Sequence, residues 1–412
     1  MKLHLLDNRT QYGYCTFGST WSAGEVSADS DFILTGEDGG EIPVFSRVTA
    51  YYPDGSVKWA AHTADSTLMG KSIEIVPKGE SKASNEVCIR ENESEYLMNL
   101  GSLSAIIPKS GNVLFKSFKT NGRMYISSAE ESLIIERREQ DISGDETIHR
   151  IRGCGIVSSV SVEERGPLVC KFLIKGTHTL STGERIIPFI IRLCFYRGSG
   201  RVSISHTFIY DGDAAHDRLG GIGIKFSTPI AGETYNRHIK FAADGGVFHE
   251  SLSLLASWRP KIPDYIYASQ MRGEMVCDDF KAVAENMPVW REYRMTQSSD
   301  GHYTILKRTA KNGVCSLCCK NGQRGDGVVA VGGENGGVML GMSEFWQKYP
   351  SELEASSLDE AEAVVTAWIY SPIAESYDFG HYTDRGFSDT YYEGFPEMGA
   401  DPVGVANTRR IY

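Results

Sequence analysis

The chain has 412 residues, more than one ordinary domain of about 100–200, so we expect two or three domains. Hydrophobic residues make up 41% and charged residues 23%, the balance of a folded globular protein, and we do not expect intrinsic disorder. The 53 acidic and 42 basic residues give a formal net charge of −11, which argues against non-specific binding to nucleic acid or an anionic membrane. A local basic pocket is still compatible with this charge.

Residues 1–85 predict a series of short strands. The segment 44–51 is mostly β-branched and aromatic, Pro53-Asp54-Gly55 has the composition of a tight turn, and 57–62 begins a second strand. Proline presets φ and glycine supplies a positive φ, so this pattern predicts a β-hairpin.

Strand patterns recur at short spacing between residues 95 and 370. In 201–210 every second residue is apolar or aromatic except His206, which predicts an antiparallel strand. Many such strands with glycine- and asparagine-rich turns predict a large antiparallel β-sandwich. Helical patterns are few, and we expect them at 278–286 and 351–363. The other strands expected here are 102–107, 155–162, 169–174 and 187–196.

The N-terminal sequence and the cysteines predict a reduced, cytoplasmic protein. The first apolar stretch is too short for a signal-peptide core, and the longest, residues 186–196, is shorter than the roughly 20 apolar residues that cross a bilayer. The nine cysteines are odd in number and thinly spread. For Cys315, Cys318 and Cys319 we favour ordinary strand and turn positions over a metal or redox site, because no second ligand pair follows at motif spacing.

Six segments, in this order and rough spacing, resemble one family along nearly the whole chain. They resemble the exo-acting rhamnogalacturonan lyases, polysaccharide lyase family 26. The segments are Thr16–Val26, Tyr51–Trp59, Arg201–Asp213, Phe345–Leu353, Ala367–Pro372 and Tyr377–Tyr382.

The resemblance implies a mainly β fold with few short helices. It implies a small RIFT-type β-barrel over residues 1–85, a central antiparallel β-sandwich over 86–372, and an extension over 373–412. In the family this extension leads to a C-terminal α/α toroid, and we expect that toroid to be missing here or supplied separately. A second departure is Gly380, where we expect a basic residue before the His-Tyr pair.

The reaction of this family, β-elimination across C4–C5 of a galacturonate, needs three functions. A cation must neutralise the carboxylate, a base must remove the C5 proton, and an acid must protonate the departing O4. His381 and Tyr382 offer a base and an acid and are our catalytic candidates. The alternative is that both only pack the extension onto the sandwich.

Aromatic and basic residues that could hold an acidic oligosaccharide occur together in an otherwise acidic chain. Tryptophan offers a face for stacking and arginine a bidentate carboxylate contact. The alternative is an ordinary polar rim. The substrate-binding candidates are Trp258, Arg272, Trp290, Arg291 and Arg385.

Several other motifs have a structural explanation that we favour over a functional one. Trp59 is expected to fill the barrel while Lys58 faces solvent, and His206 to be a hydrogen-bonded core histidine. The loop Asp211–Asp217 lacks the final glutamate of an EF-hand, so a solvated turn is favoured over calcium. Gly332–Gly337 lacks the Lys-Ser/Thr of a phosphate loop and predicts a hairpin turn.

Two functions follow as hypotheses. The first is a polysaccharide lyase-like protein that acts by β-elimination on galacturonate-containing, rhamnogalacturonan-type oligosaccharides, and that is incomplete as a catalyst if it needs a toroid. It needs no cofactor, although calcium is possible. The second is a non-catalytic β-module that binds carbohydrate or docks a separate toroid. Both exclude nucleic acid and membrane as partners.

Overall fold

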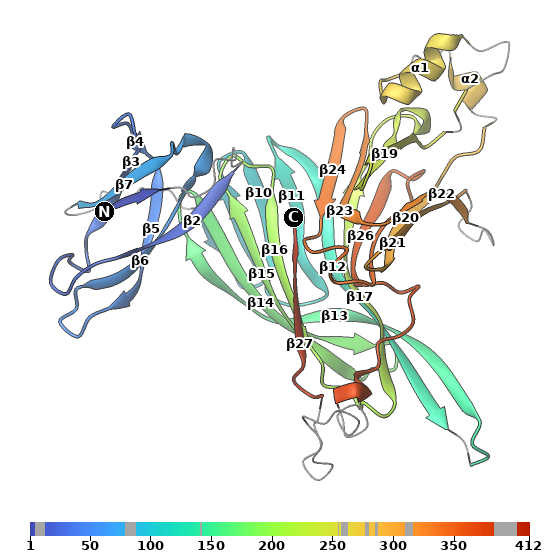
Figure 1. The fold of residues 1–412 in the computed structure, drawn as a ribbon, viewed down its shortest axis with the longest axis horizontal. Coiled ribbons are helices and arrows are strands. Elements are labelled where there is room, and N and C mark those ends of the chain that lie inside the picture. The colour runs from blue at the N-terminus through green and yellow to red at the C-terminus, as the bar shows by residue number, and fades with distance from the viewer. Residues whose placement is uncertain are drawn as a thin grey trace.

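The computed structural model describes residues 1–4, 13–78, 88–140, 142–253, 255–256, 263–276, 280–284, 287–309, 316–382 and 402–412. Antiparallel strands dominate these residues, which confirms the predicted mainly β fold class (Figure 1). No helix in the part of the chain that the structure describes is long and apolar enough to cross a membrane.

The N-terminal barrel is built from two small antiparallel sheets with a core of their own. Leu34, Val57, Ala64 and Ile75 are fully buried between the sheets. One sheet has the order β1 (Lys2–His4), β7 (Ser72–Lys78), β3 (Asp31–Thr35), β4 (Glu41–Ile42), and the other β2 (Tyr14–Thr20), β6 (Val57–Asp65), β5 (Val44–Tyr51).

The β5–β6 hairpin forms as predicted, but the expectation for Trp59 is wrong. Asp54 Oδ1 accepts a hydrogen bond from the Ser56 backbone at 2.9 Å, and Gly55 has φ 84°, which completes the turn. Trp59 is 50% exposed, because a register shift in the β5–β6 pairing between Ala50 and Tyr51 lets Val57 and Ala60 both face the core and leaves Trp59 outside it. The Lys58 ammonium lies 5.0 Å from the centre of the Trp59 ring, so the two side chains share the outer surface.

The largest sheet has 16 strands and forks at β12 (Arg123–Gln140). The first half of β12 pairs with β11 and the second half with β13, while β17 pairs with its other edge. The main path is β22 (Leu317–Gly322), β21 (His302–Arg308), β20 (Glu292–Ser299), β25 (Ser351–Ser356), β26 (Glu362–Tyr370), β17 (Asp217–Pro229), β12, β13 (Glu146–Arg165), β14 (Val169–Leu180), β15 (Arg185–Tyr196), β16 (Val202–Ile209) and β27 (Ala406–Ile411). The branch is β8 (Ile89–Glu91), β9 (Glu95–Leu100), β10 (Leu103–Pro108) and β11 (Val113–Thr120).

The fork lets the β8–β11 branch pack face to face on β14 and β15. Tyr96 meets Phe172 at 5.8 Å between ring centres, and Phe115 meets Phe195 edge to face at 6.3 Å. The inward residues of both layers are buried in one continuous core. The opposite face of β14–β16 is left uncovered by this branch.

A separate four-stranded sheet and a short helical segment complete the molecule. The sheet has the order β19 (Gly246–Ser251), β18 (His238–Ala243), β23 (Gly325–Gly333), β24 (Gly336–Gly341), and the predicted Gly332–Gly337 hairpin joins the last two strands. The helices α1 (Asp264–Arg272) and α2 (Lys281–Ala284) pack around Tyr235, Ile266 and Phe280. The short 3-10 turns are η1 (Ser66–Leu68), η2 (Thr234–Asn236) and η4 (Phe379–Tyr382).

The helix expected over 351–363 is wrong. Residues 351–356 form β25, and β26 begins at Glu362. β25 pairs with β20 on one side and β26 on the other, which buries Leu353 and Ala355 completely. This tertiary pairing outweighs the helix propensity of the glutamate, leucine and alanine residues.

Candidate functional site

The two catalytic candidates lie at the far end of β16 and β27. His381 and Tyr382 belong to η4, and nothing is described of their side chains. Phe379 of the same turn stacks on Tyr210, which directly follows β16, with 3.9 Å between ring centres. Tyr210 lies five positions after Ser205 along the extended chain, a span of about 17 Å.

Among the substrate-binding candidates, Trp290, Arg291 and Arg272 have intramolecular partners, whereas Trp258 and Arg385 lie outside the described residues. Trp290 is 9% exposed, with the Lys307 ammonium 4.1 Å from its ring centre. Arg291 forms ion pairs with Asp359 and Glu360 at 3.1 and 2.7 Å. Arg272, on α1, pairs with Glu274 at 2.7 Å. The structure therefore brings Trp290 and Arg291 together on one edge and leaves Arg272 on a different element.

The polar residues of the Asp211–Asp217 loop are also held by protein donors. The Asp211 carboxylate accepts the Ile187 backbone N–H at 2.6 Å, and Asp217, which is buried, accepts Arg137 Nε at 2.7 Å. Asp213 pairs with His216 at 2.8 Å. The solvated-turn interpretation is therefore wrong for Asp217. Within the described residues, no group of three or more His, Cys, Asp or Glu side chains is placed to hold a metal ion.

The uncovered outer surface of β14, β15, β16 and β27 is polar, and we call it the polar sheet face. Strand alternation buries Ile204, His206 and Phe208 on one side of β16 and turns serine and threonine to the other. Across the strands, Arg192 stands beside Ser205 and Ser205 beside Arg410. The next row is Lys175, Ile190, Thr207 and Thr408, with the two threonine hydroxyls 2.7 Å apart.

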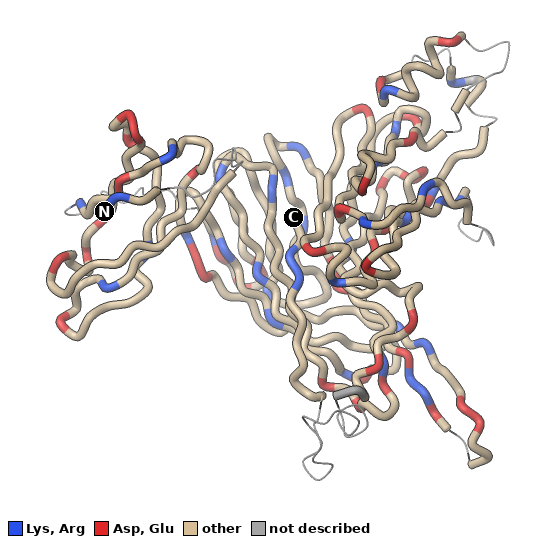
Figure 2. Tube along the Cα trace, in the orientation of Figure 1, with Lys and Arg blue, Asp and Glu red and all other residues tan. Residues whose placement is uncertain are grey.

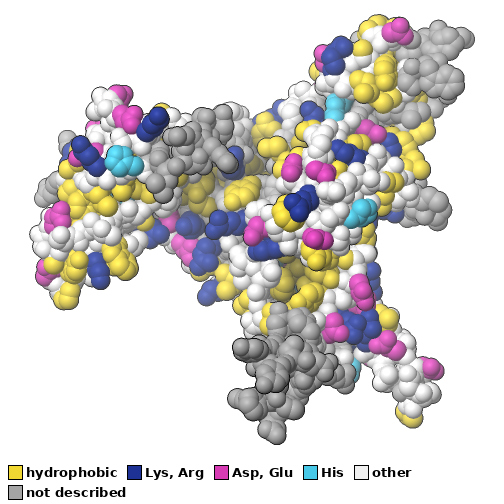
Figure 3. All heavy atoms as spheres, in the orientation of Figure 1, with side chains coloured by type: hydrophobic (Ala, Val, Ile, Leu, Met, Phe, Trp, Pro, Cys, Tyr) yellow, Lys and Arg dark blue, Asp and Glu magenta, His cyan; other side chains and the backbone are white. Residues whose placement is uncertain are grey.

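The cations of this face differ in how far they are neutralised. Arg192 pairs with Glu163 at 3.0 Å, and Lys171 pairs with Glu164 at 2.9 Å. Lys175 and Arg410 are exposed and form no ion pair with any residue that the structure describes. The cross-strand spacing places Arg410 about 10 Å from Arg192 between Cα atoms. Figure 2 shows lysine and arginine along these strands, and Figure 3 shows cationic side chains gathered on the sandwich beside the barrel.

A pair of stacked tyrosines closes the edge of the polar sheet face next to the barrel. Tyr14 of β2 lies on Tyr196 of β15 with ring centres 5.3 Å apart and an interplanar angle of 8°. Burial raises the pKa of Tyr196 well above its usual value, so its phenol stays protonated at neutral pH. Arg47 of the barrel reaches Glu164 of the sandwich at 3.1 Å, so barrel and sandwich meet at this edge.

The inner side of the same strands carries a buried carboxylate between two histidines. Glu131 Oε2 lies 3.1 Å from His206 Nε2 and 3.4 Å from His178 Nε2, and all three side chains are fully buried. Burial alone would raise the pKa of Glu131, but the two imidazoles hold it below its usual value. His206 is therefore the hydrogen-bonded core histidine that the sequence predicts, and it does not reach the polar sheet face.

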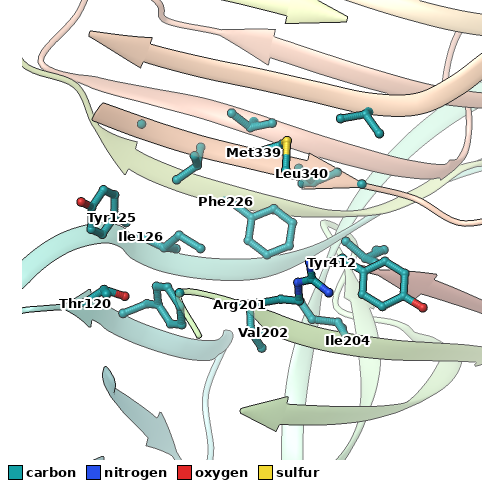
Figure 4. A pocket seen from close by; sticks show the side chains of 18 of the residues that line it. Thr120, Tyr125, Ile126, Arg201, Val202, Ile204, Phe226, Met339, Leu340 and Tyr412 are labelled. Atoms are coloured by element: carbon teal, nitrogen blue, oxygen red, sulfur yellow. The ribbon is translucent and has the colours of Figure 1, made fainter. Parts of the chain in front are cut away.

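A cavity of about 710 Å³ lies at the other end of β16, between β24 and the start of β12. Phe226, Ile126, Val202 and Leu340 give it an apolar lining, and Arg201 enters it from the β16 side (Figure 4). A mainly apolar lining suits hydrocarbon side chains better than a polyhydroxylated sugar. We therefore place the candidate sugar site on the polar sheet face.

Sequence reasoning missed Lys175, Arg410 and the hydroxyls between them. Lys175 directly follows a segment with visible strand alternation, whereas Arg410 lies in the extension where no strand is predicted, and alternation does not show which strands become neighbours. The signals that were available are the run of serine and threonine on the outward side of 201–210 and, separately, the basic pair Arg409-Arg410.

The fold is that of a barrel followed by a β-sandwich with a polar outer face, and two family models cover the whole chain. Residues 1–95 match the PcRGLX-like N-terminal RIFT barrel domain, and residues 87–412 match the PcRGLX-like protein central beta sandwich domain. The chain therefore belongs to the PcRGLX-like family, which confirms the predicted relation to the rhamnogalacturonan lyases.

Comparison with individual proteins gives less information about this chain than the family models do. The uncharacterized protein YetA of Bacillus subtilis strain 168 is 32% identical over 406 residues, which cover 96% of this chain and 47% of YetA. The chain thus spans about half the length of this relative. A galactose mutarotase-like protein from Lactobacillus casei ATCC 334 aligns at 8% identity and TM-score 0.32, over 78% of this chain and 97% of its own. A galactose mutarotase related enzyme from Lactobacillus acidophilus aligns at 10% and 0.31, over 77% and 96%. These two structural likenesses are too weak to support an argument.

Proposed function

We propose that this chain binds galacturonate-containing, rhamnogalacturonan-type oligosaccharides on the polar sheet face, as the substrate-binding part of a lyase. The observation that carries the proposal is the pair of exposed cations Lys175 and Arg410, which have no carboxylate partner among the described residues and lie on a hydroxyl-lined sheet of an acidic chain. Membership of the PcRGLX-like family supports the same class of ligand.

The chemistry of the face matches an acidic sugar chain. A guanidinium or ammonium group forms charge-assisted hydrogen bonds with a uronate carboxylate, and these are stronger than bonds between neutral groups. Ser205, Thr207 and Thr408 add hydroxyls that can both donate to and accept from sugar hydroxyls. Successive carboxylates of a bound oligosaccharide would meet Arg410 and Lys175, which lie on adjacent cross-strand rows.

For β-elimination, the same cations would neutralise the carboxylate next to the acidic C5 proton. Tyr196 is protonated at neutral pH and therefore suits the protonation of O4 rather than the removal of the C5 proton. His178 and His206 lie on β14 and β16 but point into the core. We therefore place the base outside the polar sheet face.

Titration calorimetry with rhamnogalacturonan oligosaccharides tests the binding. We expect the double variant Lys175→Gln/Arg410→Gln to bind at least about tenfold more weakly, which is about 1.4 kcal/mol. Lys116→Gln is a control outside the face, because it removes a positive charge from β11, where Lys116 pairs with Glu95, and it is compared with each single variant. Oligosaccharides with reduced carboxyl groups should bind the native chain weakly. Equal affinity of the double variant and the native chain would contradict the proposed site.

Ultraviolet absorbance of the unsaturated C4=C5 product, followed with and without calcium, separates the two functional hypotheses. A rise that the double variant slows would support a lyase that uses this face. Binding heat together with a flat absorbance trace would instead favour the non-catalytic carbohydrate-binding module.

A further inference from the structure

Trp59 stands on the outer face of the barrel sheet formed by β2, β6 and β5, where half of its side chain is exposed. Its cross-strand neighbours on this face are Thr20 of β2 and Ala50 of β5. The next row along the same face includes Gly18 and Ala61. All four neighbours are small, so the indole ring rises above its surroundings and offers a flat surface to a ligand.

The Lys58 ammonium lies beside this indole. Its Nζ is 5.0 Å from the centre of the Trp59 ring and 5.5 Å from the centre of the Tyr52 ring. In the part of the chain that the structure describes, no carboxylate forms an ion pair with Lys58, so its charge is available to an anionic ligand. Tyr51, the last residue of β5, adds an aromatic side chain that is 55% exposed.

An exposed indole next to an unpaired cation fits a sugar unit better than a protein surface. Protein interfaces have a contiguous apolar centre, whereas the ring of Trp59 is bordered by the hydroxyl of Thr20 and the ammonium of Lys58. The C–H face of a pyranose can stack on an indole, and an ammonium forms charge-assisted hydrogen bonds with a uronate carboxylate. The two side chains together therefore suit a uronate-containing sugar.

The outer face of the barrel sheet is joined to the polar sheet face. Tyr14 lies on the same side of β2 as Thr20 and stacks on Tyr196 of the sandwich. Arg47 of β5 reaches Glu164 of the sandwich at 3.1 Å. Thr20 lies six positions after Tyr14 along β2, a span of about 20 Å. A long oligosaccharide on the polar sheet face can therefore continue past the stacked tyrosines to the exposed indole.

We propose that Trp59 and Lys58 form a second sugar subsite, on the barrel, which holds a uronate-containing part of the same oligosaccharide. The inference rests on the proposed function for the class of ligand, but it uses residues of a different domain. The indole supplies the stacking surface and Lys58 the carboxylate contact. Because about 20 Å of β2 separates the stacked tyrosines from the indole, long oligosaccharides gain affinity from this subsite and short ones do not.

Titration calorimetry of the intact chain with a rhamnogalacturonan dodecasaccharide and a tetrasaccharide tests the subsite. Trp59→Ala should weaken binding of the dodecasaccharide at least about threefold and leave that of the tetrasaccharide unchanged. Trp59→Phe keeps an aromatic face and should restore part of the loss. Leu68→Ala is the matched control, because Leu68 is a similarly exposed apolar residue of the same barrel, and both affinities should stay at the native values. Thermal unfolding of each variant checks its folding.

A charge variant tests the carboxylate contact separately. Lys58→Gln should weaken binding of the dodecasaccharide and have no effect on a dodecasaccharide whose carboxyl groups are reduced. Native affinity of Trp59→Ala for the dodecasaccharide, or the same loss with both lengths, would overturn the subsite. If Lys175→Gln/Arg410→Gln still weakened binding, the polar sheet face would stand without it. No binding of the dodecasaccharide by the native chain would overturn both proposals.

Discussion

The imidazole of His62 is the residue in the barrel whose titration has the clearest consequence for stability. Its two ring nitrogens lie 2.7 Å from the hydroxyls of Ser19 and Ser46, and it is fully buried. Burial lowers its pKa from 6.5 to about 4. As the pH falls, His62 is therefore protonated in the unfolded chain before it is protonated in the folded one. The stability that the neutral, buried imidazole gives the fold is fully present above pH 6.5 and is lost as the pH falls toward 4.

The prediction is that His62→Gln reduces the loss of unfolding free energy between neutral pH and about pH 4, by up to about 3 kcal/mol. Glutamine keeps a donor and an acceptor for the two serines but takes up no proton. Urea unfolding at the two pH values measures the difference. An unchanged acid sensitivity in the variant would show that His62 does not titrate as this environment requires.

Single residues also show where sequence reasoning is secure. His206 alternates with Val202, Ile204 and Phe208, and this pattern correctly placed it in the core. Trp59 was misplaced because the pairing of β5 with β6 shifts register beside it, and local alternation does not reveal such a shift or say which face is covered. The burial of Ala60 shows which side of β6 faces the core there, and only the folded barrel reveals that burial.

At the scale of elements, β27 is held by one buried guanidinium. Arg409 donates to the carbonyls of Ser343, Glu344, Lys348 and Ile369 and to the hydroxyl of Ser351, and burial lowers its pKa to about 10. These bonds tie β27 to the turn before β25 and to the end of β26. The strand is thus fixed by contacts that lie about 40 to 66 positions away in the sequence.

Arg409→Met should therefore lower the unfolding free energy by at least about 3 kcal/mol, because several carbonyl oxygens lose a charged donor in a buried site. Arg410→Met is the matched comparison on the exposed side of the same strand and should cost under about 0.5 kcal/mol. Chemical denaturation of both variants gives the two values. Similar costs would mean that the buried arginine does not anchor β27.

Strands were predicted correctly where their own sequences alternate between apolar and polar residues. Prediction failed where pairing with neighbouring strands determines the secondary structure. The hairpin of β5 and β6 and the strands β10 and β13 to β16 follow from local alternation and turn residues. β25 has the composition of a helix and becomes a strand because β20 and β26 flank it. The α1 helix was missed, since its nine residues show only a weak apolar stripe.

At the scale of the whole molecule, the proposed function depends on the fork of the largest sheet at β12. The branch β8–β11 covers the inner face of β14 and β15, which leaves their outer face to solvent. On that face, cations from β14, β15 and β27 share one surface, although Lys175 and Arg410 are far apart in the sequence. No local pattern can predict this neighbourhood, because strand order and register arise from long-range pairing.

Hydrogen–deuterium exchange of the intact chain, with and without a rhamnogalacturonan oligosaccharide, tests the polar sheet face most directly. We predict slower exchange in β14, β15, β16 and β27 on addition of the oligosaccharide, and no change with a neutral oligosaccharide of similar length. Protection confined to other strands, or none at a concentration that gives binding heat, would contradict the assignment of the sugar site to this face.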